Sequence, residues 1–313
     1  MTLPKLAGSL AVLVVVGALA WMTTTLAGWR AAASEAAAPP LGQFVTVNGH
    51  KIHALIRGSG PDLILIHGAS GNLRDFLPLI DLLAATYRVI AMDRPGLGWS
   101  DPSPLGMTLQ GQAAILAQAA VLLGVTSPIL LGQSYGGAVA LAWGAQDTLR
   151  PRALVLVSAP ALPWQGQLDI WYRTTDTAIG QSLAPPLAAA YVPKSHVDGI
   201  LRDVFQPDPE PPGYGAMIGV GLSLRTASLR ANAAQVNALH ADLTRLQPHY
   251  PSLHLPVELV HGSADHIVPL AIHAQPLSVL LPNVTLTVLS AGHMPHHSHP
   301  AEVIAAITRA GLR

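Results

Sequence analysis

The sequence of 313 residues contains no cysteine and few charged residues. Without cysteine the chain can form no disulfide, thiolate metal site or thiol nucleophile, so its fold must be stable without covalent cross-links. Lysine and arginine number 17, aspartate and glutamate also number 17, and charged residues make up only 11% of the chain. With no basic field and no acidic tail, we expect no nucleic-acid partner. Small, weakly charged or apolar partners suit this composition better.

The chain is long enough to bury a sizeable core. Half of its residues are hydrophobic, and its length suits one large α/β domain with an insertion or two small domains. The sequence shows no internal repeat.

The N-terminal stretch from Leu6 to Leu26 is uncharged and long enough to span a bilayer as a helix. A cleaved signal peptide is the alternative, because Ala31 to Ser34 offer small residues of the cleavage type. However, the apolar stretch is longer than a usual signal core, and Trp29 and Arg30 separate it from that site. We therefore expect residues 1–30 to form an uncleaved membrane anchor.

Residues 31–43 are predicted to be a linker. The positive charges flanking the anchor nearly balance, with Lys5 and the amino terminus on one side and Arg30 on the other. We expect a short cytoplasmic N-terminus with the remaining chain outside the cytoplasm. Secretion after signal cleavage stays open as the alternative.

Short apolar runs alternate with helix-forming segments through most of the remaining chain, which predicts an α/β fold with a mostly parallel central sheet flanked by helices. A hairpin around Asn48-Gly49 opens this part. The predicted buried strands are Leu63 to Ile66, Tyr87 to Met92, Ile129 to Leu131, Ala153 to Val157, Val257 to Val260 and Val284 to Leu289. The predicted helices between and after them are Arg74 to Ala85, Thr108 to Leu123 and Pro300 to Gly311.

This rhythm is interrupted by residues 160–250, which contain no comparable strand pattern. We predict a mostly helical insertion there, with a helix from Ser228 to Leu246 and proline-rich breaks at Pro185-Pro186 and from Pro207 to Pro212. The insertion divides the α/β core into residues 44–159 and 251–313.

The segment Gly132-Gln-Ser134-Tyr-Gly136 places a serine between a predicted strand and a predicted helix. The pattern Gly-x-Ser-x-Gly in this context is typical of a nucleophile elbow, in which a sharp turn holds the serine in a strained conformation at the end of the strand. Glycines on both sides let the chain approach closely enough for this turn. The pattern alone also occurs by chance in glycine-rich turns.

Asp265 and His293 follow two later predicted strands. The carboxyl ends of parallel strands gather at one edge of a sheet, so we expect both side chains to lie near Ser134. A serine hydroxyl is a weak nucleophile, and the chemistry needs His293 as base and Asp265 to orient the imidazole. Asp169 and Asp242 are the alternative acids.

Tetrahedral intermediates need hydrogen-bond donors for the oxyanion. The candidates are the backbone N–H groups of Tyr135, at the start of the predicted helix, and Ala69, in the loop after Ile66. Ser70 is the alternative to Ala69.

Several motifs occur together in family order, and through them the chain resembles the α/β-hydrolase superfamily, specifically its capped esterase-like members. The motifs are His67-Gly68, Asp93-Arg94-Pro95-Gly96-x-Gly98-x-Ser100, Gly132-x-Ser134-x-Gly136-Gly137, Gly262-x-x-Asp265-x-x-Val268-Pro269 and Gly292-His293. The resemblance covers about residues 44 to 313 and implies that residues 160–250 form a cap. Epoxide hydrolases and haloalkane dehalogenases of the superfamily carry aspartate where this chain has Ser134.

We therefore expect a serine hydrolase that acts on a small-molecule ester or acyl substrate through an acyl-enzyme, without a cofactor. The low charge and the anchor make a lipid-like substrate plausible. A carbon-carbon bond hydrolase or perhydrolase with the same triad is one alternative. A membrane-tethered binding protein that keeps the fold without catalysis is another.

Four histidines near the C-terminus, at 293, 296, 297 and 299, have spacings that resemble a metal site. We expect no metal, because no acidic ligand lies among them and prolines interrupt the segment. The last three are predicted at the surface or at a pocket rim. His67 and His261, which precede glycines at strand ends, are predicted to make local hydrogen bonds. Aromatic residues of the insertion can fill its core or line a pocket; they are Trp164, Trp171, Tyr172, Tyr191 and Tyr214.

Overall fold

The computed structural model describes residues 3–312, and its centre is an eight-stranded sheet of order β1-β2-β4-β3-β5-β6-β7-β8. The strands are β1 (Gln43–Val47), β2 (His50–Arg57), β3 (Asp62–Ile66), β4 (Arg88–Met92), β5 (Ile129–Gln133), β6 (Ala153–Val157), β7 (Val257–Gly262) and β8 (Val284–Leu289). β1 and β2 pair antiparallel, as expected from the hairpin, β2 also pairs antiparallel with β4, and the remaining pairs are parallel. The predicted fold class is confirmed.

Helices cover both faces of the sheet, because successive side chains of its central strands point to opposite sides. Ile64 and Ile66 pack with α3 (Leu109–Leu122), α4 (Tyr135–Gly144) and α10 (Ala274–Leu280) on one face. Leu63 and Leu65 pack with α2 (Leu77–Leu83) and α12 (Pro300–Gly311) on the other. Three short helices lie in the connections, namely η1 (Leu73–Phe76), η2 (Pro104–Met107) and α11 (Pro295–Ser298).

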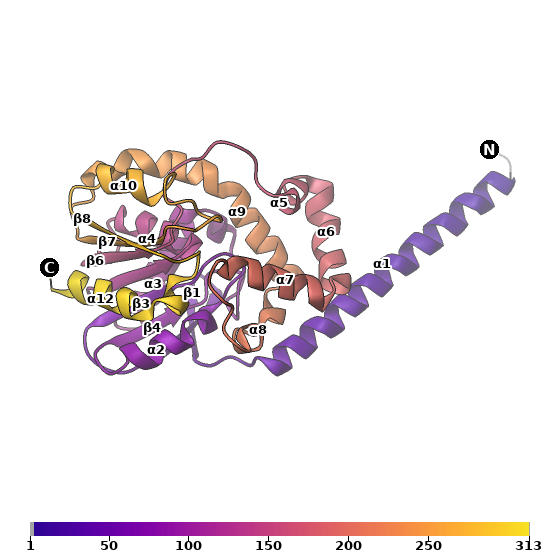
Figure 1. Cartoon of the computed structure of the whole chain (residues 1–313). Helices are drawn as coiled ribbons and strands as arrows, with labels where there is room; N and C mark the ends of the chain where they lie inside the picture. The colour runs from indigo at the N-terminus through magenta and orange to yellow at the C-terminus, as the bar shows by residue number, and fades with distance from the viewer. Residues whose placement is uncertain (1–2, 313) are drawn as a thin grey trace.

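The chain between β6 and β7 is helical, as predicted, and we call it the helical segment. Its elements are α5 (Ile170–Thr175), α6 (Ala178–Tyr191), α7 (Lys194–Phe205), α8 (Tyr214–Met217), η3 (Val220–Leu222), α9 (Thr226–Leu246) and η4 (Gln247–Ser252). Figure 1 shows α9 running beside the sheet, with α5, α6 and α7 between it and α1.

The predicted break at Pro185-Pro186 is wrong, because α6 continues through both prolines. Proline lacks the N–H that would bond to the carbonyl four residues earlier, which leaves the carbonyls of Gln181 and Ser182 without helical donors. Arg230 on α9 supplies them: its Nε lies 3.3 Å from the Gln181 oxygen and its Nη2 3.2 Å from the Ser182 oxygen. One guanidinium thus replaces two missing helical bonds.

The N-terminal helix α1 (Leu3–Ala37) is longer than predicted, since residues 31–37 of the expected linker are helical. Alanine is the best helix former, and this stretch is rich in it. Residues Val12–Ala37 form a helix long and apolar enough to cross a membrane. Figure 1 shows α1 extending well beyond the rest of the chain. Its C-terminal part is tied down through an ion pair of 2.8 Å between Glu35 and Arg225.

Candidate active site

Ser134 lies in a sharp turn between β5 and α4. Its backbone has φ 50° and ψ −126°, a region that residues with side chains rarely adopt. A Cβ on Gly132 would lie 2.3 Å from the carbonyl oxygen of Gly136, so the strand and the helix approach this closely only because position 132 is glycine. The turn leaves the Ser134 side chain partly exposed at the carboxyl end of the central strand.

The structure brings the three predicted side chains into one hydrogen-bonded chain. Ser134 Oγ lies 2.9 Å from Nε2 of His293, and Nδ1 of His293 lies 2.8 Å from Oδ2 of Asp265. A single imidazole tautomer, with its proton on Nδ1, satisfies both contacts because Nε2 then accepts from the serine. The three residues follow β5, β7 and β8, which end at the same edge of the sheet.

Asp265 is buried and held as an anion. Its Oδ1 accepts from the backbone N–H groups of Ile267 and Val268 at 3.0 and 2.9 Å. Burial acts to raise the pKa of Asp265, but the hydrogen bond and charge of His293 outweigh it, and the pKa lies below its ordinary value. The carboxylate therefore stays ionised where it faces the imidazole.

The two alternative acids serve other local contacts. Asp169 accepts from the N–H of Trp171 at 2.8 Å and caps α5. Asp242 accepts from the N–H of Leu109 at 2.8 Å. Neither is hydrogen-bonded to His293.

The loop after β3 passes directly beside the serine. A Cβ on Gly68 would lie 3.1 Å from that of Ser134, so the peptide that joins Gly68 to Ala69 runs next to the nucleophile. Tyr135 is the first residue of α4, on the other side of Ser134. The N–H of Ser70, the alternative donor, already bonds to Oδ1 of Asn232 at 2.7 Å.

Arg94 is a buried cation beneath this loop that the sequence reasoning named only as part of a motif. Its Nε donates to the carbonyl of His67 at 3.0 Å and its Nη2 to that of Gly68 at 2.9 Å. Its Nη1 donates to the side chains of Gln112 and Gln235 at 2.8 and 2.7 Å. Burial lowers the pKa of Arg94 to about 10, which still leaves it charged at neutral pH.

The guanidinium also lies 4.3 Å from the centre of the Tyr135 ring. Arg94 therefore contacts both segments that carry the candidate oxyanion donors. Within the described residues 3–312, no carboxylate forms an ion pair with it.

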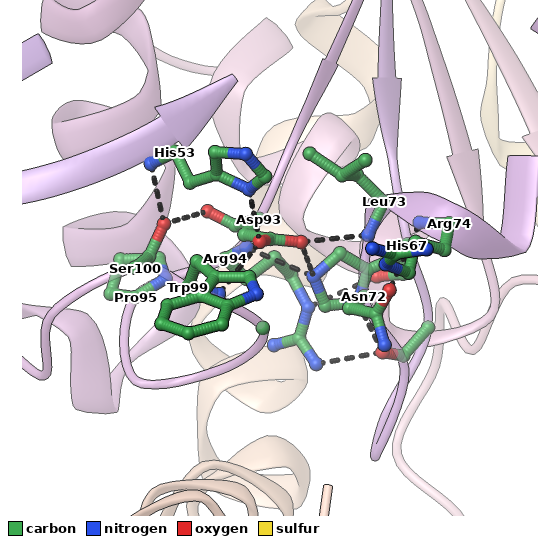
Figure 2. Close-up of polar contacts among 12 residues, drawn as sticks. His53, His67, Asn72, Leu73, Arg74, Asp93, Arg94, Pro95, Trp99 and Ser100 are labelled. Carbon is green, nitrogen blue, oxygen red and sulfur yellow. Dashed lines mark hydrogen bonds and ion pairs between the residues drawn. The ribbon is translucent and has the colours of Figure 1, made fainter. Parts of the chain in front are cut away.

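Asp93, the first residue of the motif after β4, connects the neighbouring loops through its carboxylate (Figure 2). Its carboxylate accepts from Nδ1 of His53 at 2.7 Å, and from the backbone N–H groups of Leu73 and Trp99 at 2.7 and 2.8 Å. A Cβ on Gly98 would lie 2.2 Å from this carboxylate. Asp93 thus fixes the loops around the site without contacting the three central side chains.

The prediction of local hydrogen bonds for His67 and His261 is confirmed. His67 Nδ1 lies 2.9 Å from the carbonyl of Gly68, and its Nε2 accepts from the N–H of Arg94 at 2.9 Å. His261 Nε2 donates to the carbonyl of Val268 at 2.7 Å.

The prediction that His296 lies at the surface or at a pocket rim is wrong, because His296 is buried against Asp75. Nε2 of His296 and of His297 lie 3.0 and 2.9 Å from the Asp75 oxygens, and the Tyr214 hydroxyl donates to Asp75 at 2.7 Å. The ligand atoms of Asp75, His296 and His297 lie within 4.8 Å of one another, which is close enough for a cation. The fold thus brings an acidic side chain to these histidines, which the local sequence around them does not contain.

The aromatic residues of the helical segment have different surroundings. Tyr214 is buried, Trp164 packs half-buried against His273, and Tyr172 bonds to Asn232 at 3.4 Å. Tyr191, at the end of α6, is exposed.

Comparison with known proteins gives a consistent family. The model of the family described as "Alpha/beta hydrolase family" matches residues 63–306. An uncharacterised protein of Mycobacterium tuberculosis is 27% identical over 292 residues, which cover 87% of this chain and 81% of that protein. The pimeloyl-[acyl-carrier protein] methyl ester esterase of Xylella fastidiosa is 28% identical over 272 residues, covering 80% and 95%.

Solved structures share the fold. Esterase RhEst1 from Rhodococcus sp. matches with a TM-score of 0.68 and 25% identity, covering 87% of this chain and 98% of its own. A bacterial membrane phospholipase A matches with a TM-score of 0.62 and 22% identity, covering 99% of both chains. The latter match therefore extends over α1 as well as the sheet.

Proposed function

The chain belongs to the alpha/beta hydrolase family and is a hydrolase, and from this we propose that it cleaves carboxylic esters by nucleophilic catalysis at Ser134. The observation that carries the proposal is the hydrogen-bonded chain of Ser134, His293 and Asp265 beside a partly exposed hydroxyl. The similarity to two esterases supports the choice of an ester as substrate.

In the proposed reaction, Ser134 Oγ attacks the ester carbonyl while His293 Nε2 takes the hydroxyl proton. The imidazolium then gives that proton to the leaving alcohol as the carbon-oxygen bond breaks, which leaves an acyl group on Ser134. Water attacks the acyl-enzyme in the same way, and the acid is released. Asp265 keeps the Nδ1 proton in place and stabilises the imidazolium throughout.

The backbone N–H groups of Tyr135 and Ala69 are proposed to bind the oxyanion. The Ala69 N–H belongs to the same peptide unit as the Gly68 carbonyl, which accepts from Arg94. A charged donor on that carbonyl fixes the peptide plane and polarises the N–H at its other end. Arg94 is therefore a positioning residue for the oxyanion donor.

The helical segment, residues 160–250, is proposed to cap this site, and α1 to anchor the chain in a membrane with the hydrolase part outside the cytoplasm. An apolar acyl chain is the substrate portion that fits such a location. The membrane phospholipase A that matches over α1 supports a lipid-like ester as the substrate class.

The test uses the full chain in detergent with a series of p-nitrophenyl esters and a fluorophosphonate probe. We expect the Ser134→Ala variant to lose both ester turnover and probe labelling, because no other side chain occupies the nucleophile position. Ser158, a buried serine after the neighbouring strand β6, provides a matched control as Ser158→Ala. Retention of turnover and labelling by Ser134→Ala would refute the proposal. A vinylogous diketone tested in parallel distinguishes carbon-carbon bond hydrolysis.

A further inference from the structure

Helix α6 carries a stripe of exposed apolar side chains. Ile179, Leu183, Leu187 and Tyr191 are spaced four residues apart, which places them along one side of the helix. Their exposed fractions are 75%, 57%, 48% and 46%. A water-facing helix of a soluble domain would carry polar residues on this side.

The composition of α6 differs from that of the next helix. No residue of α6 carries a charge at neutral pH, whereas α7 contains Lys194, Asp198, Arg202 and Asp203. The exposed side of α7 therefore suits water. That of α6 suits an apolar environment.

The C-terminal end of helix α6 packs on α1. Thr23 Oγ1 is 3.0 Å from the Tyr191 hydroxyl, and Ala27 packs on Ala189 and Ala190. Arg30 donates to the last carbonyls of α6, reaching the oxygen of Ala190 at 2.8 Å and that of Val192 at 3.0 Å. Small residues at this contact let the two helices approach closely.

A groove is bounded by α1, by α6, by the loop after β4 and by the start of α9. Its volume is about 930 Å³. The apolar side chains that line it from α1 and α6 are Val16, Leu19, Leu183, Pro186 and Leu187. Leu183 and Leu187 of α6 therefore share a groove with residues 16–20 of α1, which lie inside the uncharged stretch that precedes Trp29 and Arg30.

From this arrangement we propose that α6 is immersed in the lipid bilayer beside α1, with the stripe Ile179, Leu183, Leu187 and Tyr191 in contact with lipid. The inference rests on the proposed membrane-spanning role of α1. Helix α1 fixes the depth of α6, because Thr23 and Arg30 hold the C-terminal end of α6. The groove then sets Leu183 and Leu187 beside residues 16–20, where α1 is apolar and exposed. Trp21 and Trp29, both exposed, mark the band where aromatic side chains meet the lipid headgroups. They are about 12 Å apart along α1 at the rise of an α-helix.

This placement has a direct consequence for substrate access. The helical segment that is proposed to cover Ser134 would touch the bilayer through α6, so an acyl chain could reach the site without crossing water. A second copy of the chain is the other occupant that an apolar stripe could accept. The experiment separates the two.

Because the chain has no cysteine, single cysteines can be labelled without background. We would place a bimane label at Leu183→Cys and Leu187→Cys on α6, at Leu19→Cys on α1, and at Leu122→Cys on α3 as the matched control, since Leu122 is equally exposed at 61%. The labelled chains are reconstituted into phosphatidylcholine vesicles with ordinary or dibrominated acyl chains. A cooperative thermal unfolding transition of each variant confirms that it is folded.

We expect bromine-dependent loss of fluorescence at positions 183 and 187 similar to that at position 19, and none at position 122. Quenching at 19 but not at 183 and 187 would overturn the immersion of α6 and leave the anchor intact. No quenching at 19 would refute the anchor and the inference together. If the α6 labels are shielded from water to the same extent in both kinds of vesicle, a second copy of the chain covers the stripe. This outcome would overturn the lipid contact. Quenching at 122 as well would also overturn it. None of these outcomes depends on Ser134 chemistry.

Discussion

The edge of the sheet that carries Ser134 and the pair of helices α1 and α6 show opposite arrangements of polarity. At the sheet edge, charged groups such as Asp93, Arg94 and Asp265 are buried, and each is held by several hydrogen bonds. On α1 and α6, large apolar side chains are exposed instead. In one region of the chain, burial strengthens the electrostatic interactions between charged groups and their partners. In the other, exposed apolar side chains suit an apolar solvent.

The contrast between the two regions would fail most clearly if the buried charge of Asp265 had no function. We expect Asp265→Asn to lower kcat by about 10⁴-fold, because an amide cannot hold the imidazole in the required tautomer. The measurement is ester turnover by the purified variant. Asp242→Asn is the control, since Asp242 is also buried and also accepts a backbone N–H. Equal activity of the two variants would contradict the assignment.

Acid should destabilise the sheet region and spare the helix pair. Burial lowers the pKa of His67 and of His273 to about 4. An unfolded histidine has a pKa of about 6.5, so the unfolded chain binds protons first as the pH falls. The stability that each histidine contributes is complete above about pH 6.5 and is lost between there and pH 4, about 3 kcal/mol for each.

Urea unfolding at pH 7.5, 5.5 and 4.5 measures this loss. The His273→Gln variant should show a shallower dependence on pH. Helix α6 contains no side chain that titrates in this range, so lipid quenching at position 183 should be the same at pH 7.5 and 5.5. A pH-independent unfolding free energy would contradict the buried neutral histidines.

Replacement of Arg94 tests whether a buried charge at the sheet edge can act through its neighbours, since Arg94 is proposed to position an oxyanion donor without touching the substrate. We expect Arg94→Met to lower kcat by about 10²-fold with little change in KM, since the oxyanion donor acts mainly in the transition state. Fluorophosphonate labelling should slow in parallel, and Arg94→Lys should recover part of the rate. Arg88→Met, which removes a partly exposed ion pair with Asp62, is the control. A variant that loses thermal stability but keeps kcat would assign Arg94 a structural role only.

The smallest effect is expected at the boundary between the two regions. Glu35 on α1 pairs with Arg225, but its side chain is 40% exposed. Glu35→Gln should therefore change the free energy of unfolding by less than about 1 kcal/mol. A thermal denaturation scan in detergent measures this. A loss of several kcal/mol would show that this pair, and not the contact between α1 and α6, holds the N-terminal helix.

The sequence predicted the sheet well, because most of its strands are short apolar runs that end in a loop marked by glycine or proline. That Ser134, Asp265 and His293 lie together could be predicted for the same reason: each follows such a run, and parallel strands bring their ends together. Local pattern and global fold agree there.

Predictions failed where a distant partner decides the local structure. The helix through Pro185-Pro186 depends on Arg230, and the burial of His296 depends on Asp75, which lies 221 residues earlier. No local pattern reveals either partner. Arg94 could have been singled out by its place between Asp93 and Pro95 after a buried strand, but only the structure shows that it reaches the carbonyl of Gly68.

The contacts of α9 determine which part of the helical segment can move. Asn232 accepts from Ser70, Asp242 accepts from Leu109, and Gln235 donates to the carbonyls of Pro95 and Gly106. These bonds join α9 to the sheet layer at three successive levels, and breaking them would leave buried polar groups unpaired. Any opening that admits a bulky molecule would therefore leave α9 in place.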